Sequence, residues 1–191
     1  MICVFRSYAD ASVRAWCATH ARRATRALRR VAVALLIAIG SLGFVTGAAN
    51  ADSLAAATAA YARGDYVRAV RTLTPLALRG NPRAQAVLGF LYENGFGAPQ
   101  AYDAAVDLYF QAAARGNAFA QAMLGLMYDK GHGVPEDFVL AYKWLNLAAA
   151  RAPKRERDYY LRLRNAVASK MAPEQIVAGQ RLALAWAPGQ F

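Results

Sequence analysis

The sequence has few of the side chains that enzymes use as nucleophiles, bases or metal ligands. Its 191 residues include only two cysteines, Cys3 and Cys17, and beyond residue 51 its serines and histidines are Ser53, Ser169 and His132. Residues 52–191 therefore have no disulfide, no thiolate metal site and no cysteine nucleophile. The motifs G-x-S-x-G, S-x-x-K and H-E-x-x-H are also absent, so we predict that the protein is not an enzyme.

Three short patterns resemble binding motifs but have structural explanations. The glycines at 95 and 97 lack the third glycine of a phosphate-binding loop, and both are suited to ending a helix. His132 lies in a glycine-flanked turn with no metal-ligand motif around it, so we interpret it as a loop-surface residue. The tripeptide Arg63-Gly64-Asp65 falls where a turn between helices is expected. We therefore predict no cofactor and no metal ion.

Long apolar runs are also scarce, and the one that approaches membrane-spanning length extends from Val31 to Val45. These 15 residues follow five arginines at positions 22 to 30 and precede the small-residue sequence Ala49-Asn50-Ala51. This arrangement is typical of a signal peptide, and we predict cleavage after Ala51 and export to the periplasm or the exterior. The alternative is an uncleaved leader that anchors the protein in the inner membrane, for which about 20 apolar residues are usual.

The charge of the chain depends strongly on this leader. The formal net charge is +11, but residues 1–51 hold seven basic and one acidic residue, which leaves 16 basic and 11 acidic residues and a net charge of +5. The basicity therefore does not indicate nucleic-acid binding. One basic stretch remains, with Arg155, Arg157, Arg162 and Arg164 at helical spacing. It forms a candidate stripe for anionic envelope polymers or lipid headgroups, or a solvated face whose side chains lie over apolar neighbours.

The remainder of the chain is organised by a 36-residue repeat. Residues 79–114 and 115–150 align without a gap, with 16 of 36 positions identical. The segment YVRAVRTLTPLAL, residues 66–78, is a more divergent copy of the second half of the repeat. We therefore divide the chain into a leader at 1–51, an N-terminal cap helix with a partial repeat at 52–78, the two repeats, and C-terminal capping helices at 151–191.

Each repeat is predicted to fold as two helices. The first begins at Asn81-Pro82, because Asn caps free amide groups and Pro fits the first turn, and it ends at the following glycines. Gly89 and Gly125 fall inside first helices at a cost of about 1 kcal/mol each, which predicts close backbone packing there. The second helices and the capping helices are predicted at 102–114, 137–150, 54–63, 154–169 and 173–186.

The sequence AFAQAMLGLMYDKGHGVP, residues 118–135, and its counterpart PRAQAVLGFLYENGFGAP, residues 82–99, resemble the Sel-one-like repeats, relatives of the tetratricopeptide repeats. Trp144 matches the family pattern, whereas Leu108 stands where Trp is usual, and the cysteine pair of some members is missing. The tail at 171–186 is similar to the terminal helix that closes exported members. The resemblance implies an all-α fold, a short right-handed α-solenoid of stacked helical hairpins with capping helices.

The resemblance also implies binding of a protein or peptide partner on a concave face built mainly from the first helices. We expect no nucleic acid, and membrane contact only through the leader or weakly through the basic stripe. The surface candidates are first-helix positions that vary between copies: Arg83, Phe90, Glu93, Asn94, Phe119, Met127, Asp129 and Lys130.

Two alternatives to a free envelope adaptor remain open. One is a hydrolase acting on cell-wall material or β-lactams, an activity attributed to some repeat relatives, for which only Ser53, Ser169 and the acidic residues could supply the chemistry. The other is the same scaffold held at the membrane by an uncleaved leader.

Overall fold

The computed structural model describes residues 53–189, which all belong to one compact unit, Asn50–Phe191. The leader predicted at 1–51 lies outside the described residues. Residues 53–189 form helices and turns and contain no strand. Within the described part, no helix combines the length and the hydropathy needed to cross a bilayer.

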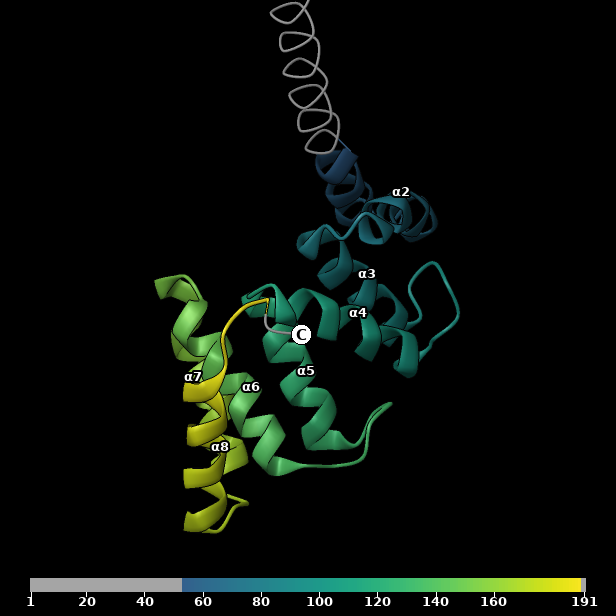
Figure 1. Cartoon of the computed structure of the whole chain (residues 1–191). Helices are drawn as coiled ribbons and strands as arrows, with labels where there is room; N and C mark the ends of the chain where they lie inside the picture. Colours follow the sequence, from purple (N-terminus) through teal and green to yellow (C-terminus); the bar gives the residue numbers. More distant parts are fainter. Residues whose placement is uncertain (1–52, 190–191) are drawn as a thin grey trace, which may run out of the picture. The chain divides into compact units, whose positions relative to one another are not determined.

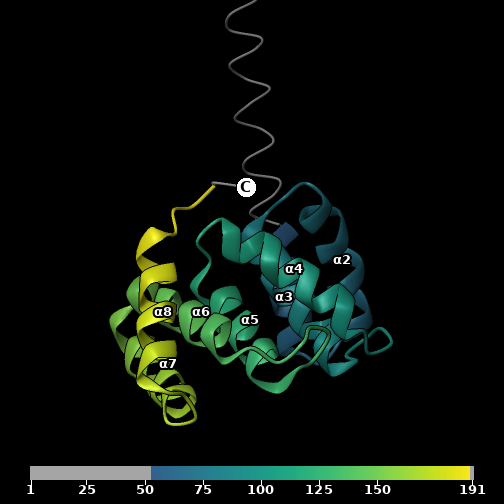
Figure 2. The same ribbon diagram turned by 60° about the horizontal axis from the view of Figure 1, so that its bottom comes forward.

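The helices follow one another as stacked hairpins (Figures 1 and 2). Residues 53–62 are helical and precede α2. Each helix from α2 to α6 packs against the next one, and α8 packs on α6. Both α7 and α8 therefore lie against α6. The bounds are α2 Tyr66–Leu78, α3 Pro82–Asn94, α4 Tyr102–Ala114, α5 Ala118–Lys130, α6 Phe138–Arg151, α7 Lys154–Ala168 and α8 Pro173–Ala185.

Local capping explains why the predicted bounds agree with these within one residue. The side chain of Asn81 accepts hydrogen bonds from the backbone amides of Arg83 and Ala84 at 3.0 and 3.1 Å, and α3 ends at Gly95 with φ +68°. The same pair of signals recurs 36 residues later, with Asn117 before α5 and Gly131 after it. An Asn cap and a left-handed glycine fix both ends of each first helix.

Two glycines inside the first helices let the second helices approach closely, as predicted. A Cβ atom added to Gly89 of α3 would lie 2.9 Å from the Tyr109 ring on α4. One added to Gly125 of α5 would lie 2.8 Å from Leu145 and 3.1 Å from the carbonyl oxygen of Ala141 on α6. In each hairpin the second helix therefore contacts the backbone of the first helix at a glycine, and a methyl group there would push the two helices apart.

The loop that joins the two helices of each hairpin packs against the preceding hairpin. Gly97 has φ +72° and approaches the backbone of Tyr66 so closely that a Cβ atom would overlap it. In the next repeat, a Cβ atom on Gly133 would lie 2.8 Å from the carbonyl carbon of Tyr102. Beside these glycines, the Phe96 ring stacks on Tyr66, with centroids 4.8 Å apart.

His132 has the equivalent place in the second repeat. Its ring lies on Tyr102, with centroids 4.7 Å apart, where the first repeat stacks Phe96 on Tyr66. The side chain is half-buried and belongs to the contact between neighbouring hairpins. We predicted a loop-surface residue, and His132 does lie in the loop, but it is half-buried against the neighbouring hairpin. Among the described residues, no group of three or more acidic, His or Cys side chains could hold a metal ion.

The departure from the family pattern at Leu108 leaves a recess on the first hairpin. Leu108 is half-buried and lines a surface cavity of about 260 Å³ together with Leu88 and Tyr92. At the same position of the second repeat, Trp144 is 2% exposed and belongs to the core. The smaller side chain in the first repeat therefore leaves open a volume beside α4.

We predict that Gly125→Ala destabilises the protein, although Ala is the better helix former by about 1 kcal/mol. The added methyl group meets Leu145 and the Ala141 carbonyl oxygen, and overpacking of this kind costs about 1–3 kcal/mol. Urea unfolding of the wild type and the variant measures the difference. A variant more stable than the wild type would contradict close packing at Gly125.

Candidate functional site

The first helices form a groove on the described surface. One part, of about 500 Å³, lies between the helical segment 53–62, α3 and the start of α5. A second part, of about 260 Å³, continues along the same helices and shares Thr58, Val87 and Phe119 with the first. We call this the first-helix groove, and its lining residues are Leu54, Ala55, Thr58, Tyr61, Arg83, Ala86, Val87, Phe90, Asn117 and Phe119.

Aromatic rings form one wall of the first-helix groove. The Phe90 ring contacts Tyr61 edge-on with centroids 6.3 Å apart, and it contacts both Phe96 and Phe119 at 6.2 Å. The four side chains come from three different helices and a loop, so the fold holds them in place before any ligand arrives. All four are half-buried, which leaves part of each ring available at the surface. Such partly exposed aromatic rings are favourable contact points for a partner.

Two polar side chains of the groove, Thr58 and Asn117, are hydrogen-bonded within the protein. The Thr58 hydroxyl donates to the carbonyl oxygens of Leu54 and Ala55 at 3.1 and 2.9 Å. The Asn117 side chain accepts from the backbone amide of Ala120 at 2.9 Å. Arg83 is the only charged side chain lining the groove, and in the described part of the chain its guanidinium has no hydrogen bond or ion pair. The groove is therefore apolar with one available positive charge.

Three of the predicted surface residues line the first-helix groove, one is buried in the core, and the others lie at the ends of helices. Arg83, Phe90 and Phe119 line the first-helix groove. The predicted surface position of Met127 is wrong, because its side chain is 1% exposed and packs in the main core cluster. Its counterpart Leu91 is fully buried as well. The variation between copies at this position is an exchange of one core side chain for another.

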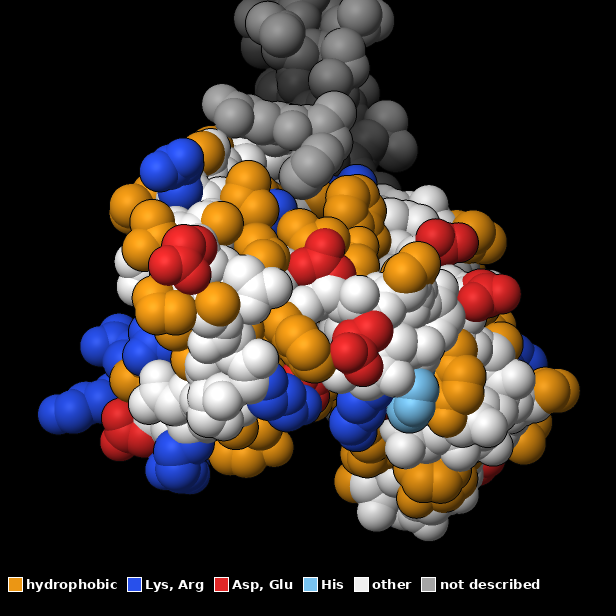
Figure 3. Space-filling view, turned by 90° about the horizontal axis from the view of Figure 1, so that it is seen from below, with side chains coloured by type: hydrophobic (Ala, Val, Ile, Leu, Met, Phe, Trp, Pro, Cys, Tyr) orange, Lys and Arg blue, Asp and Glu red, His pale blue; other side chains and the backbone are white. Residues whose placement is uncertain are grey.

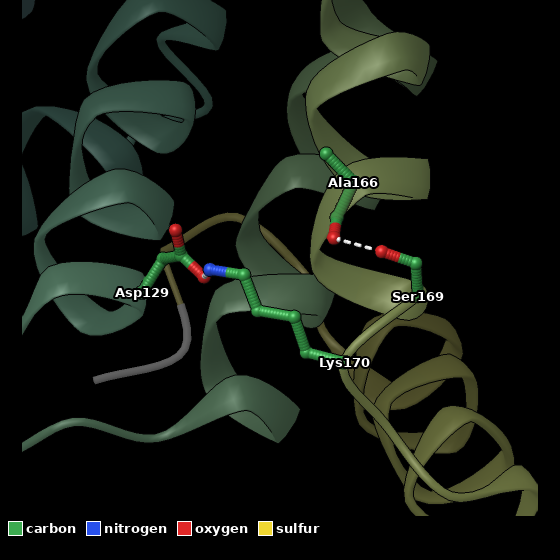
Figure 4. A network of polar contacts seen from close by, with 4 residues as sticks. All are labelled: Asp129, Ala166, Ser169 and Lys170. Atoms are coloured by element: carbon green, nitrogen blue, oxygen red, sulfur yellow. Dashed lines mark hydrogen bonds and ion pairs between the residues drawn. The ribbon is translucent and has the colours of Figure 1, made fainter.

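The other predicted residues lie at the C-terminal ends of α3 and α5, where their polar groups are mostly engaged. The Glu93 carboxylate accepts a hydrogen bond from the Tyr109 hydroxyl at 2.7 Å, and Asn94 donates to the Phe90 carbonyl oxygen at 2.8 Å. The Asp129 carboxylate pairs with the Lys170 ammonium group at 2.8 Å, as can be followed in Figure 4. Lys130 is exposed at the end of α5. Neither Glu93 nor Asp129 lines the first-helix groove.

Sequence reasoning missed the part of the groove that the segment 53–62 supplies. Leu54, Thr58 and Tyr61 follow one another at a spacing of four and three residues, which places them on one helical face. Val87 lies between Arg83 and Phe90 at the same spacing on α3. This periodicity could have indicated that segment 53–62 has one face for packing or binding. It did not show that the segment lies beside α3 and forms part of the groove.

The predicted basic stripe on α7 is only partly available. Arg155, Arg157 and Arg162 are exposed, whereas Arg164 is half-buried and donates to Asn146 on α6 at 3.0 Å. The Arg164 side chain therefore holds α7 against α6 and does not belong to a free stripe. Figure 3 shows Lys and Arg side chains gathered toward the side formed by α7 and α8.

Ser169, the serine considered for hydrolytic chemistry, makes a local backbone contact. Its hydroxyl donates to the Ala166 carbonyl oxygen at 2.8 Å, one helical turn earlier (Figure 4). A serine nucleophile needs its proton accepted by a positioned base. The contact described for Ser169 is instead that of a residue at the C-terminal end of a helix.

Comparison with known protein families identifies the repeating unit. A family model for the Sel1 repeat matches residues 82–117 and 118–152. Residues 82–152 are two Sel1 repeats. The resemblance inferred from the sequence is confirmed, and the matched units begin three residues after those found by internal alignment. Sel1 repeats generally serve as scaffolds for protein–protein interaction.

Solved structures with Sel1-type folds are similar to this chain. One is c5321, a protective antigen of uropathogenic Escherichia coli with an SLR fold, at 23% identity and a TM-score of 0.64 over 70% of this chain and 29% of that one. Another is a Sel1 repeat protein from Oxalobacter formigenes, at 27% identity and a TM-score of 0.55 over 68% of this chain and 54% of that one. This chain therefore spans only part of each. No curated protein matches the chain at a significant level.

We predict that Tyr109, which ties Glu93 of the Sel1 repeat to α4, makes the fold sensitive to alkaline pH. Burial, and then the neighbouring Glu93 carboxylate, raise the pKa of the Tyr109 phenol. A phenol with a raised pKa in the folded state stabilises the fold below the unfolded value of about 10, and this contribution is lost as the pH rises above it. The free energy of unfolding should therefore fall above about pH 10.

Tyr109→Phe should make this fall shallower and should lower the free energy of unfolding at pH 7 by about 1–3 kcal/mol, because a hydrogen bond to a charged group is lost. Tyr159→Phe, at an exposed position, is the control for removal of a hydroxyl. Chemical unfolding between pH 7 and 12 measures both effects. An unchanged pH slope in Tyr109→Phe would contradict the role assigned to this phenol.

Proposed function

We propose that the protein is an exported, non-enzymatic adaptor that binds a peptide segment of a protein partner in the first-helix groove. The observation that carries the proposal is the groove itself, an apolar channel walled by preformed aromatic contacts with one unpaired guanidinium. The general use of Sel1 repeats as interaction scaffolds supports it.

The chemistry of the groove defines the partner segment. Phe90, Phe119 and Tyr61 offer apolar surface for one or two large hydrophobic side chains. Arg83 offers a charge that a carboxylate can pair with, and Arg binds carboxylates well because its donors form a planar fork. We therefore expect a segment that carries large apolar side chains next to an acidic residue.

The location follows from the sequence of residues 1–51. A basic segment, a short apolar run and Ala49-Asn50-Ala51 support export through a signal peptide. The cell envelope is then the compartment in which the partner is met. N-terminal sequencing of the protein made in a bacterial host tests this, and a mature chain beginning at Asp52 is expected. Recovery of an uncut leader in the membrane fraction would favour the tethered form instead.

The groove can be tested on residues 50–191, because they form a compact unit that contains the three core clusters of the described residues. Selection from a random peptide library should enrich segments with aromatic or aliphatic residues beside Asp or Glu. Arg83→Glu should weaken binding of an enriched peptide by tenfold or more, since about 1.4 kcal/mol corresponds to a factor of ten.

Two matched variants define the site. Phe119→Ala should also weaken binding because it removes part of the aromatic wall. Arg157→Glu changes the same charge on α7, outside the groove, and should leave the affinity unchanged. Enrichment of peptides without acidic residues, or equal affinities for Arg83→Glu and Arg157→Glu, would contradict the proposed recognition.

A further inference from the structure

The first repeat contains a hydrogen-bonded clamp that joins two hairpins. Arg115, just after α4, donates to the Gly80 carbonyl oxygen and to the Gln85 side-chain oxygen, the latter at 3.4 Å. The Gln85 side-chain nitrogen in turn donates to the Ala77 carbonyl oxygen at 3.1 Å. Gln85 is 1% exposed, so both ends of its amide are paired inside the protein. We call this arrangement the Gln–Arg clamp.

The second repeat has the same residues 36 positions later, but its clamp is open. Gln121 donates to the Ala113 carbonyl oxygen at 3.1 Å, as Gln85 does to Ala77. The Gln121 side-chain oxygen, however, is buried and has no hydrogen-bond partner among the described residues. Arg151, which corresponds to Arg115, does not reach it.

Residues 186–189, which we call the C-terminal strap, lie against Arg151 and the end of α4. The Arg151 guanidinium lies over the Trp186 ring, 4.3 Å from its centroid. Trp186 meets Trp144 edge-on with centroids 6.2 Å apart, and the Gly189 amide donates to the Ala114 carbonyl oxygen at 3.1 Å. The strap thus returns to the end of α4, beside the open clamp.

Opposing effects act on the strap. The closed position gains a cation–π contact and burial of the indole ring. It also leaves two buried polar atoms unpaired, the Gln121 side-chain oxygen and the Trp186 indole nitrogen, and such atoms are unfavourable in a protein interior. Burial lowers the pKa of Arg151, which shows that the charged group loses solvation there.

The first repeat shows what the alternative arrangement is. Arg115 lies 2.6 Å from the position that a Cβ atom on Gly80 would take, and Arg151 already lies 3.4 Å from the equivalent position at Gly116. Arg151 therefore lies beside Gly116, as Arg115 lies beside Gly80.

We propose that the C-terminal strap is a two-state latch, in which Arg151 exchanges between the Trp186 ring and the Gln–Arg clamp of the second repeat. In the open state the clamp closes as in the first repeat, and Trp186 leaves α6 and exposes the edge of Trp144. The exposed surface lies on a second helix and the cap, so the proposal is independent of the first-helix groove.

Hydrogen exchange measured by NMR on residues 50–191 tests the latch. The Gly189 amide and the Trp186 indole N–H should exchange through an opening of lower free energy than global unfolding, with little dependence on denaturant. If both exchange only through global unfolding, the strap is a fixed part of the fold and the proposal is overturned.

Gln121→Met removes the acceptor that the open state needs, so it should slow Gly189 exchange roughly fivefold, the equilibrium effect of one net hydrogen bond. Gln85→Met is the matched control in the first repeat, and it should lower global stability without slowing Gly189 exchange. Unchanged or faster exchange in Gln121→Met overturns the proposal.

Trp186→Ala provides a second test that does not depend on Gln121→Met folding. Without the indole ring, Arg151 should join the clamp, and its side-chain N–H resonance should move toward that of Arg115 and exchange more slowly with solvent. An Arg151 side chain that exchanges faster than in the wild type would show that the clamp does not form, and would overturn the proposal.

Discussion

The arrangement of the helices depends on the close approach of two backbones inside each repeat. At Gly89 and Gly125 the first helix offers no side chain, and the second helix fills that space with Tyr109 or with Leu145. This contact fixes the distance between the helices of a hairpin, and with it the position of the next first helix. The first-helix groove lies between segment 53–62, α3 and α5, and the glycine contacts set the position of the last two.

The two repeats share one backbone plan but use equivalent positions differently. The acidic position near the end of the first helix binds the Tyr109 hydroxyl in one copy, through Glu93, and Lys170 in the other, through Asp129. The arginine at the end of the second helix completes a clamp in one copy, as Arg115, and covers an indole ring in the other, as Arg151. The second repeat adjoins a cap instead of another repeat, so its side chains meet different partners there.

Much of this fold could be predicted because its signals are local. Asn81, Gly95 and their counterparts mark the helix ends by hydrogen bonds and backbone angles within a few residues. The groove could only be half predicted, since Tyr61 comes from a segment without a clear repeat counterpart. Met127 was misplaced because variation between copies does not separate a surface position from a core position that tolerates Leu or Met. The contact between Arg151 and Trp186 joins residues 35 positions apart, which helical periodicity does not report.

The loops at Gly97 and Gly133 have a consequence for how such a protein can change in evolution. Each loop rests on the backbone of the preceding hairpin, at Tyr66 or Tyr102, so an inserted residue would lift it off its neighbour. Duplication or loss of a whole 36-residue unit preserves every one of these contacts. The chain can therefore lengthen or shorten in complete units far more readily than one of its turns can grow.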